Sequence, residues 1–225
     1  MIECTGFNKV SLVDWPGRVS AVVFLRGCNF RCPWCQNPDL VEPSRSAPLV
    51  TADGVLQYLR QRRAMLDGLV VTGGEPTLSP GLTAFLALVK EIGLPVKLDT
   101  NGSRPEVVRE LLDRRLVDAV AVDYKAPLRL YGSLVSCDNP ENVAATIAAV
   151  LRQKRGYVRT TVVPGLHTPE LLTEMVKAFP GLNAGNHRLQ GFRPGTCLNP
   201  EYNRLPQVTP HEIARLSKEL QGAYL

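Results

Sequence analysis

Residues 27–37 read GCNFRCPWCQN and place three thiols, those of Cys28, Cys32 and Cys35, in one short loop. The apolar run at 19–25 precedes this loop and has the composition of a strand buried on both faces. Thiolates separated by three and then two residues can converge on one metal centre, and soft sulfur ligands select zinc, copper(I) or iron–sulfur clusters. The loop has no fourth thiol, so it predicts a metal centre with an open coordination position.

The length and composition are those of an ordinary globular protein. The chain has 225 residues, of which 44% are hydrophobic and 21% are charged, so it can bury a large core without disulfide bonds. We expect a single domain over 1–225, with an N-terminal arm or ribbon at 1–17, the main fold at 18–193 and a C-terminal extension with a helix at 194–225. The net charge of +5 is modest and spread out, which does not favour a nucleic-acid partner.

The N-terminus has an early acid and no long apolar segment, so we expect neither a signal peptide nor a membrane span, and a cytoplasmic location. Reduced thiols then fit better than disulfides. Cys4, Cys137 and Cys197 are scattered singly, and we interpret them as bystanders. Because they form no second CxxC group, no additional iron–sulfur cluster is expected.

Apolar strand-like runs alternate with helical patterns about six times along the chain, which predicts a parallel sheet with right-handed crossovers. The expected strands are 19–25, 69–71, 95–98, 117–122, 157–163 and 187–192, and the expected helices are 51–65, 80–92, 104–114, 139–154, 168–179 and 210–220, with a connector at 43–48. Either a barrel or an open doubly wound sheet would place the strands' carboxyl ends on one face. We favour an α/β fold of the partial (β/α)6 TIM-like barrel type. Every strand end carries a candidate site residue, whereas an open sheet would place such residues at the switch point between its two halves.

The second expected strand ends in Gly73, Gly74 and Glu75. Glycines leave room for a ligand to approach the backbone, and a carboxylate can hold an ammonium group. The alternative is a tight turn with a solvated acid. Proximity to the cysteine loop favours the ligand interpretation.

Two further strand ends and one strand interior carry polar residues. Asp99, Thr100 and Asp123 supply oxygen atoms that could hold a cation or satisfy backbone donors, and the residues alone favour the second role. Lys125 could meet an anionic ligand, although an exposed lysine is usually solvated. Arg159 lies inside an apolar strand and needs a partner or a ligand.

The histidines occur singly, with no spacing typical of a metal site, and we expect no catalytic role for them. They are His167, His187 and His211.

The cysteine spacing, with Trp34 before the third thiol and with Gly-Gly-Glu-Pro at 73–76, resembles the radical S-adenosylmethionine (SAM) superfamily. The chain is most similar to the activating enzymes of glycyl-radical enzymes, and among them to the activating protein of anaerobic ribonucleoside-triphosphate reductase. The supporting stretches are TGFNK at 5–9, SLVDWPG at 11–17, DTNG at 99–102, DYKAP at 123–127 and RTTVVPG at 159–165.

This resemblance implies that Cys28, Cys32 and Cys35 ligate a [4Fe–4S] cluster whose open iron binds SAM. It implies that SAM is also contacted by Trp34, Asn37, Gly73, Gly74, Glu75, Lys125 and Arg159, with the two glycines and Glu75 at the methionine ammonium. It further implies a monovalent cation at Asp99, Thr100 and Asp123, and no catalytic residue beyond the cluster and SAM.

The implied activity is reductive cleavage of SAM followed by abstraction of a glycine Cα hydrogen from a partner glycyl-radical enzyme, the anaerobic ribonucleotide reductase. A low-potential donor such as flavodoxin or ferredoxin would supply the electron. Two alternatives stay open: a radical SAM enzyme acting on a small molecule such as a deazaguanine precursor, and a zinc-binding structural or nucleic-acid-binding module.

One position departs from the family pattern. The related activating enzymes usually have His-Asn after the third cysteine, whereas this chain has Gln36 and Asn37. Glutamine keeps the capacity to form hydrogen bonds but does not titrate, so any role that needs an imidazole there is not expected.

Overall fold

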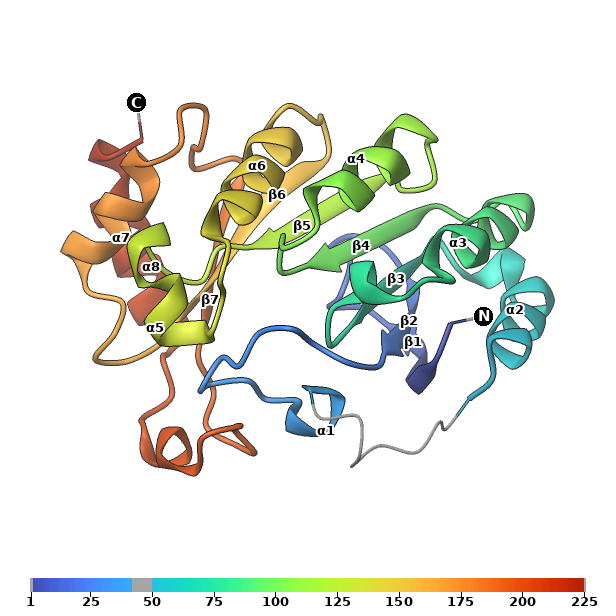
Figure 1. Ribbon diagram of the computed structural model, residues 1–225, viewed down its shortest axis with the longest axis horizontal. Coiled ribbons are helices and arrows are strands. Elements are labelled where there is room, and N and C mark those ends of the chain that lie inside the picture. The colour runs from blue at the N-terminus through green and yellow to red at the C-terminus, as the bar shows by residue number, and fades with distance from the viewer. Residues whose placement is uncertain (1, 42–49, 225) are drawn as a thin grey trace. The chain divides into compact units, whose positions relative to one another are not determined.

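The computed structural model describes residues 2–41 and 50–224; the connector expected at 43–48 lies outside these residues. The fold is α/β, with a seven-stranded sheet in the order β1-β2-β3-β4-β5-β6-β7 (Figure 1). The chain divides into two compact units. Unit 1 comprises 1–29, 39–100 and 106–120, and unit 2 comprises 30–38, 101–105 and 121–225. The expected domain borders at 17/18 and 193/194 stay a prediction.

The strands of unit 1 carry the first part of the sheet. β1 (Cys4–Ser11) pairs antiparallel with β2 (Ser20–Leu25), which confirms that the N-terminal segment packs against the first apolar run. β2 then pairs in parallel with β3 (Gly68–Gly73), and β3 with β4 (Val96–Thr100). Most residues of β2 and β3 are buried, as expected of strands covered on both faces.

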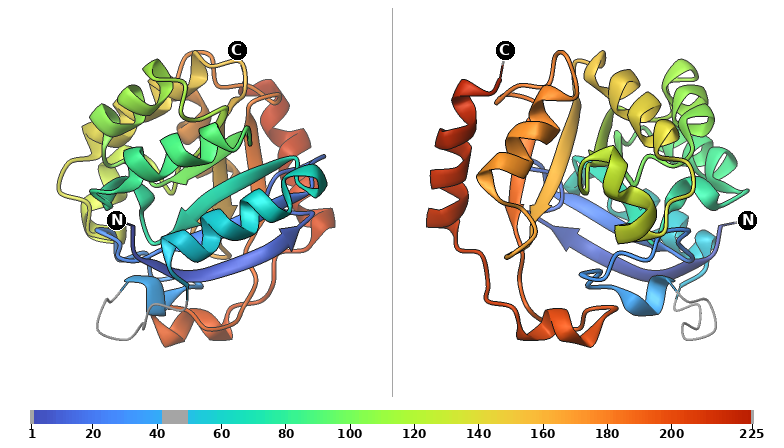
Figure 2. Two further views of the ribbon diagram at one scale, coloured as in Figure 1. Left: turned by 90° about the vertical axis from the view of Figure 1, so that its right-hand side faces the viewer. Right: turned by 60° about the vertical axis from the view of Figure 1, so that its left-hand side comes forward.

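The helices of unit 1 follow the expected alternation. They are α2 (Ala52–Gln61), α3 (Leu82–Glu91) and α4 (Pro105–Asp113), and α1 (Pro38–Val41) is one short turn. Thr51 caps α2, because its Oγ1 accepts a hydrogen bond of 3.1 Å from the Gly54 amide. Figure 2 shows α2 running along β1, where the Tyr58 ring meets the Phe7 ring edge-on with centroids 5.3 Å apart.

The boundary between the two units falls within β5 (Ala119–Asp123), whose carboxyl end belongs to unit 2. In unit 2, β6 (Gly156–Val162) pairs in parallel with β7 (His187–Gly191). Its helices are α5 (Tyr131–Val135), α6 (Pro140–Leu151), α7 (Pro169–Lys177) and α8 (Pro210–Glu219). All of these except α5 were expected; a five-residue helix is too short to show an apolar period.

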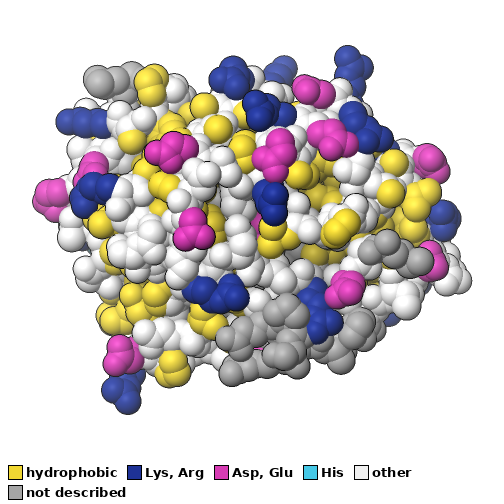
Figure 3. Space-filling model, viewed as in Figure 1, with side chains coloured by type: hydrophobic (Ala, Val, Ile, Leu, Met, Phe, Trp, Pro, Cys, Tyr) yellow, Lys and Arg dark blue, Asp and Glu magenta, His cyan; other side chains and the backbone are white. Residues whose placement is uncertain are grey.

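Short 3₁₀ turns complete the secondary structure at Arg63–Met65, Pro76–Leu78, Leu128–Leu130, Pro200–Arg204 and Leu220–Gly222. Within the described residues no helix is long and apolar enough to cross a membrane. On the face shown in Figure 3, the basic and acidic side chains of the described residues are interspersed.

Candidate functional site

The cysteine loop begins directly after β2. Cys28 belongs to unit 1, whereas Cys32 and Cys35 belong to unit 2, where the Cys35 amide donates a 2.9 Å hydrogen bond to the Cys32 carbonyl and forms a tight turn. None of the three thiols forms a disulfide; Cys32 is buried and the other two are half-buried. Thiols that are not oxidised to disulfides suit a soft metal centre. Within the described residues, no three His, Cys, Asp or Glu side chains are grouped to hold a single metal ion.

Gly73 and Gly74 allow the end of β3 to approach the beginning of the cysteine loop. A Cβ at Gly73, whose φ is +128°, would lie 2.3 Å from the backbone N and O of Leu25, and one at Gly74 would lie 2.0 Å from the carbonyl oxygen of Gly27. The Gly74 amide donates to Leu25 O at 2.9 Å and the Glu75 amide donates to Gly27 O at 2.7 Å. In unit 1 both glycines are therefore required by close backbone packing. The sequence alone does not reveal this requirement, because there the glycines indicate either the approach of a ligand to the backbone or a tight turn.

Glu75 is buried, with 1% of its surface exposed, and its carboxylate organises the loop around it. Oε1 accepts hydrogen bonds from the Thr77 amide at 3.0 Å, from the Thr77 hydroxyl and from the Thr100 hydroxyl at 2.8 Å. This carboxylate therefore joins the ends of β3 and β4 inside unit 1. Its expected contact with the SAM ammonium stays a prediction.

A buried ion pair lies beside this loop. Lys97 is fully buried, and its Nζ donates to Asp99 Oδ1 at 2.5 Å and to the Asp14 carbonyl at 2.7 Å. A buried ammonium needs such partners, since an unpaired charge is costly to desolvate. The Asp99 carboxylate is thus balanced by a lysine, and its predicted role as a cation ligand stays a prediction.

In unit 2, Asp123 at the end of β5 holds two cationic side chains. Its Oδ1 accepts from Arg159 Nε at 2.8 Å and its Oδ2 accepts from Lys125 Nζ at 3.3 Å. Burial by itself would raise the pKa of Asp123, but Arg159 and Lys125 together hold that pKa well below its usual value. The structure therefore brings three predicted residues together and gives Arg159 the partner that its apolar strand required.

The second half of the cysteine loop is packed by aromatic rings. Trp34 is buried and meets His167 edge-on, with ring centroids 6.2 Å apart, and Tyr202 lies at the same centroid distance. Gln36 donates its side-chain amide to the Arg193 carbonyl, and Asn37 is exposed. Gln36 thus fixes the cysteine loop to the segment after β7.

Two residues of this region were not predicted from the sequence. Tyr131 accepts a hydrogen bond of 2.9 Å from the Lys125 amide, and His167 Nε2 lies 3.0 Å from the Lys125 carbonyl. Each residue occurs alone in the sequence, with no spacing typical of a site, so no sequence signal could have identified it.

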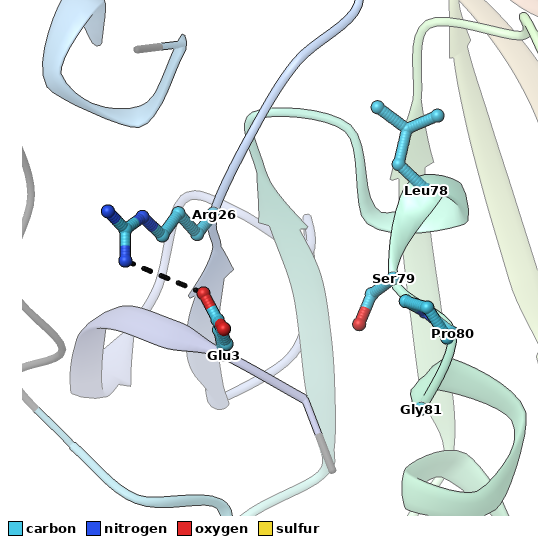
Figure 4. Close-up of a pocket in the computed structure, with 6 residues that line it drawn as sticks. All are labelled: Glu3, Arg26, Leu78, Ser79, Pro80 and Gly81. Carbon is cyan, nitrogen blue, oxygen red and sulfur yellow. Dashed lines mark ion pairs between the residues drawn. The ribbon is translucent and has the colours of Figure 1, made fainter. Parts of the chain in front are cut away.

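A separate cavity of about 420 Å³ lies in unit 1 (Figure 4). It is lined by Glu3, Arg26, Leu78, Ser79, Pro80 and Gly81. Arg26 pairs with Glu3 at 3.5 Å, and its Nε is buried with no hydrogen-bond partner among the described residues. None of the predicted site residues lines this cavity.

Comparison with known proteins identifies the class. Residues 22–178 match the Radical SAM superfamily. The chain is 32% identical over 222 residues, 95% of its length and 90% of the relative's, to the Methanocaldococcus jannaschii protein named "Putative glycyl-radical enzyme activating enzyme MJ1227". It is also 30% identical over 178 residues to the pyruvate formate-lyase-activating enzyme of Staphylococcus aureus, covering 70% of this chain and 67% of that enzyme. The chain therefore belongs to the radical SAM superfamily and, within it, to the glycyl-radical enzyme activating enzymes.

Solved structures support the fold. Streptococcus suis SuiB, in a crystal structure with S-adenosylmethionine, superposes with a TM-score of 0.64 at 15% identity over 86% of this chain. TYW1 with a lysine-pyruvate adduct gives 0.63 at 17% identity over 91%. This chain covers 44% of SuiB and 74% of TYW1. These likenesses confirm the expected partial TIM-like barrel. The superfamily uses a [4Fe–4S] cluster and SAM, and the thiols of the cysteine loop, which form no disulfide, fit such a cluster.

Proposed function

We propose that this protein activates a glycyl-radical enzyme, and that the partner is an anaerobic ribonucleoside-triphosphate reductase. The observation that carries the activating role is the 32% identity to a named activating enzyme over nearly the full length of both chains. The partner is proposed from the sequence stretches that surround the cysteine and glycine motifs. No observation favours a small-molecule substrate or a zinc-binding module.

Cys28, Cys32 and Cys35 would hold the cluster, with Trp34 and Asn37 beside SAM. Glu75, presented by the Gly73–Gly74 turn, would accept the SAM ammonium, because its buried carboxylate is already fixed by hydroxyl and amide donors. When bound, the reduced cluster and SAM supply a radical that abstracts a hydrogen atom.

Lys125 and Arg159 would bind the carboxylate or ribose side of SAM, since Asp123 holds both cations at one strand end. The three side chains carry a net positive charge, so an anionic group that enters there gains electrostatic stabilisation. Asp99, Thr100 and Asp123 remain the proposed ligands of a monovalent cation. For the protein as a whole we propose a cytoplasmic location, a flavodoxin or ferredoxin as electron donor, and no nucleic-acid partner.

The decisive experiment is anaerobic reconstitution with iron and sulfide, followed by addition of a reductant and SAM. We expect brown protein, formation of 5′-deoxyadenosine, and a glycyl-radical signal by electron paramagnetic resonance when the reductase is added. Pyruvate formate-lyase is the matched alternative partner, because its activating enzymes are also similar to this chain. A signal with the lyase alone would overturn the reductase assignment, and no signal with either would overturn the activating role.

A further inference from the structure

The main chain of Lys125 is held on both sides by buried aromatic side chains. Its amide donates to Tyr131 Oη at 2.9 Å, and its carbonyl lies 3.0 Å from His167 Nε2. His167 Nδ1 accepts the Val163 amide at 2.9 Å, so the ring proton resides on Nε2 and is donated to Lys125. The backbone amide and carbonyl of Lys125 are therefore both fixed by side chains, one six residues away and the other 42 residues away in the sequence.

The same two side chains also contact the cysteine loop. The Tyr131 ring meets Phe30 edge-on, with centroids 6.1 Å apart and an angle of 82°, and the His167 ring meets Trp34 at 6.2 Å and 83°. Edge-to-face pairs are directional, so each ring is restrained by its neighbour as well as by its hydrogen bond. Phe30 and Trp34 flank Cys32, and all of these residues belong to unit 2.

The side chains of Tyr131 and His167 have little freedom to move. Tyr131 is fully buried and His167 is 6% exposed, so both occupy fixed positions in the packed interior. Burial raises the pKa of Tyr131 and lowers the pKa of His167, so both side chains stay neutral at physiological pH. The two connections between Lys125 and the cysteine loop are therefore stiff and do not depend on pH near neutrality.

We propose that Tyr131 and His167 are positioning residues, which set the distance between Lys125 and the loop carrying Cys32 and Cys35. This inference rests on the proposed role of Lys125 in binding SAM and deepens it. A bound SAM would have to meet Lys125 and the cluster together, so a displacement of Lys125 would weaken its charge-assisted contact with SAM. Two independent aromatic connections would prevent that displacement.

Tyr131→Phe tests the first connection, because it removes the hydroxyl and keeps the ring against Phe30. We expect the KM for SAM, measured by 5′-deoxyadenosine formation without any partner protein, to rise about tenfold while kcat stays within about twofold. In cluster-free protein we expect hydrogen exchange of the Lys125 amide to accelerate about tenfold or more, because that amide loses its acceptor.

Tyr124→Phe is the matched control. It makes the same change one residue before Lys125, and the Tyr124 hydroxyl has no hydrogen-bond partner among the described residues. It should leave the KM for SAM and the exchange of the Lys125 amide unchanged. Equal effects of the two substitutions would overturn the assignment for Tyr131.

His167→Gln and His167→Leu test the second connection. Glutamine can still donate to the Lys125 carbonyl, whereas leucine fills space without a donor. We expect a KM for SAM within about threefold of wild type for glutamine and at least about tenfold higher for leucine. Trp34 is one of two tryptophans, so emission from cluster-free protein, with Trp34→Phe as reference, reports the loop position. A shift with leucine but not with glutamine is expected.

The glycyl-radical measurement tests the activating role, whereas the KM for SAM and the exchange of the Lys125 amide test the positioning role. Absence of a glycyl radical with either partner would overturn the activating role, but it would not change the ratio of KM values for SAM. If Tyr131→Phe and His167→Leu both retain the wild-type KM and the wild-type exchange rate of Lys125, the positioning role is wrong, whichever protein is the partner.

Discussion

Gly74 has no side chain, and this allows the end of β3 to lie against the backbone of the cysteine loop. An alanine there would place a methyl group 2.0 Å from the Gly27 carbonyl oxygen, so the backbone of the cysteine loop would have to move. We expect Gly74→Ala to lower the free energy of unfolding of the cluster-free protein by about 2 to 4 kcal/mol, through overpacking and the loss of the two local backbone hydrogen bonds. Urea denaturation would measure the change.

Gly195→Ala is the control for this prediction, because Gly195 is exposed and a Cβ there meets nothing within 4 Å. Its effect should be within about 0.5 kcal/mol of zero. Equal stability of the two variants would contradict the packing explanation. The sequence identified the glycine pair as important but could not supply this reason, because the contact with Gly27 depends on two strands paired in register.

Tyr124 presents the opposite case, a buried hydroxyl with no hydrogen-bond partner among the described residues. Burying an unsatisfied polar group costs roughly 1 to 3 kcal/mol, while the ring itself packs well against Phe179. Tyr124→Phe should therefore leave stability unchanged or raise it by up to about 1 kcal/mol in urea denaturation. A loss larger than about 1 kcal/mol would show that the hydroxyl has a partner.

At the scale of elements, His187 connects β7 to β6 and to the C-terminal segment. Its Nε2 lies 3.0 Å from Thr160 Oγ1 and its Nδ1 lies 3.1 Å from Tyr224 Oη. Thr160 Oγ1 donates its own proton to the Tyr124 carbonyl, so it can accept from Nε2, and the neutral imidazole is fully satisfied. Burial lowers the pKa of His187 to about 4.

This shift gives stability a pH dependence with a defined sign. The unfolded chain takes up the His187 proton near its ordinary pKa of 6.5, whereas the folded protein resists it down to about 4, so stability falls as pH decreases between these values. The contribution is on the order of 3 kcal/mol. The difference in unfolding free energy between wild type and His187→Gln should shrink from pH 7 to pH 4.5. A difference independent of pH would contradict the assignment.

Element boundaries were predicted to within a few residues, and the strands and helices of the alternation are confirmed. The pattern succeeded because parallel strands are continuous apolar runs and the helices carry apolar faces and caps. It failed for α5, which is too short to be periodic, although this helix carries Tyr131. Tyr131 was therefore missed together with its helix, whereas His167 lies outside α5 and was missed because a single histidine has no spacing typical of a site.

For the whole molecule, we predict that the three cysteines of the loop bind iron and that the other three cysteines do not. Single alanine substitutions at Cys28, Cys32 and Cys35 should each reduce the iron bound after reconstitution to near zero, because each removes a proposed ligand. Substitutions at the three other cysteines should leave the iron content unchanged. Colorimetric iron analysis with near-ultraviolet and visible absorption would measure it.

The other cysteines, Cys4, Cys137 and Cys197, are all buried. Burial raises the pKa of Cys4 to about 11 and raises the pKa of the other two thiols as well, so the thiolate form that binds metal is disfavoured. A loss of iron in any of these three variants would contradict their interpretation as bystanders, provided that the variant unfolds at the wild-type urea concentration.

Family and fold were predictable for the whole chain because they depend on short local motifs. These motifs are the three thiols of one loop and the glycine pair at a strand end. The sequence predicted that the cation of Arg159, inside an apolar strand, needs a partner. It did not predict that Asp123 would pair with both Arg159 and Lys125. Which groups would meet depended on tertiary packing, as did the pairing of Lys97 with Asp99.

Gln36 also bears on how the protein acquires its metal. Its amide holds the Arg193 carbonyl by donating a hydrogen bond, a task that a neutral imidazole could also perform. An imidazole beside three thiols would add a nitrogen ligand that suits zinc, copper or nickel. The amide adds none, so we expect Gln36 to leave the three loop thiols, which are the proposed iron ligands, without a competing nitrogen ligand at this position when other transition metals are present.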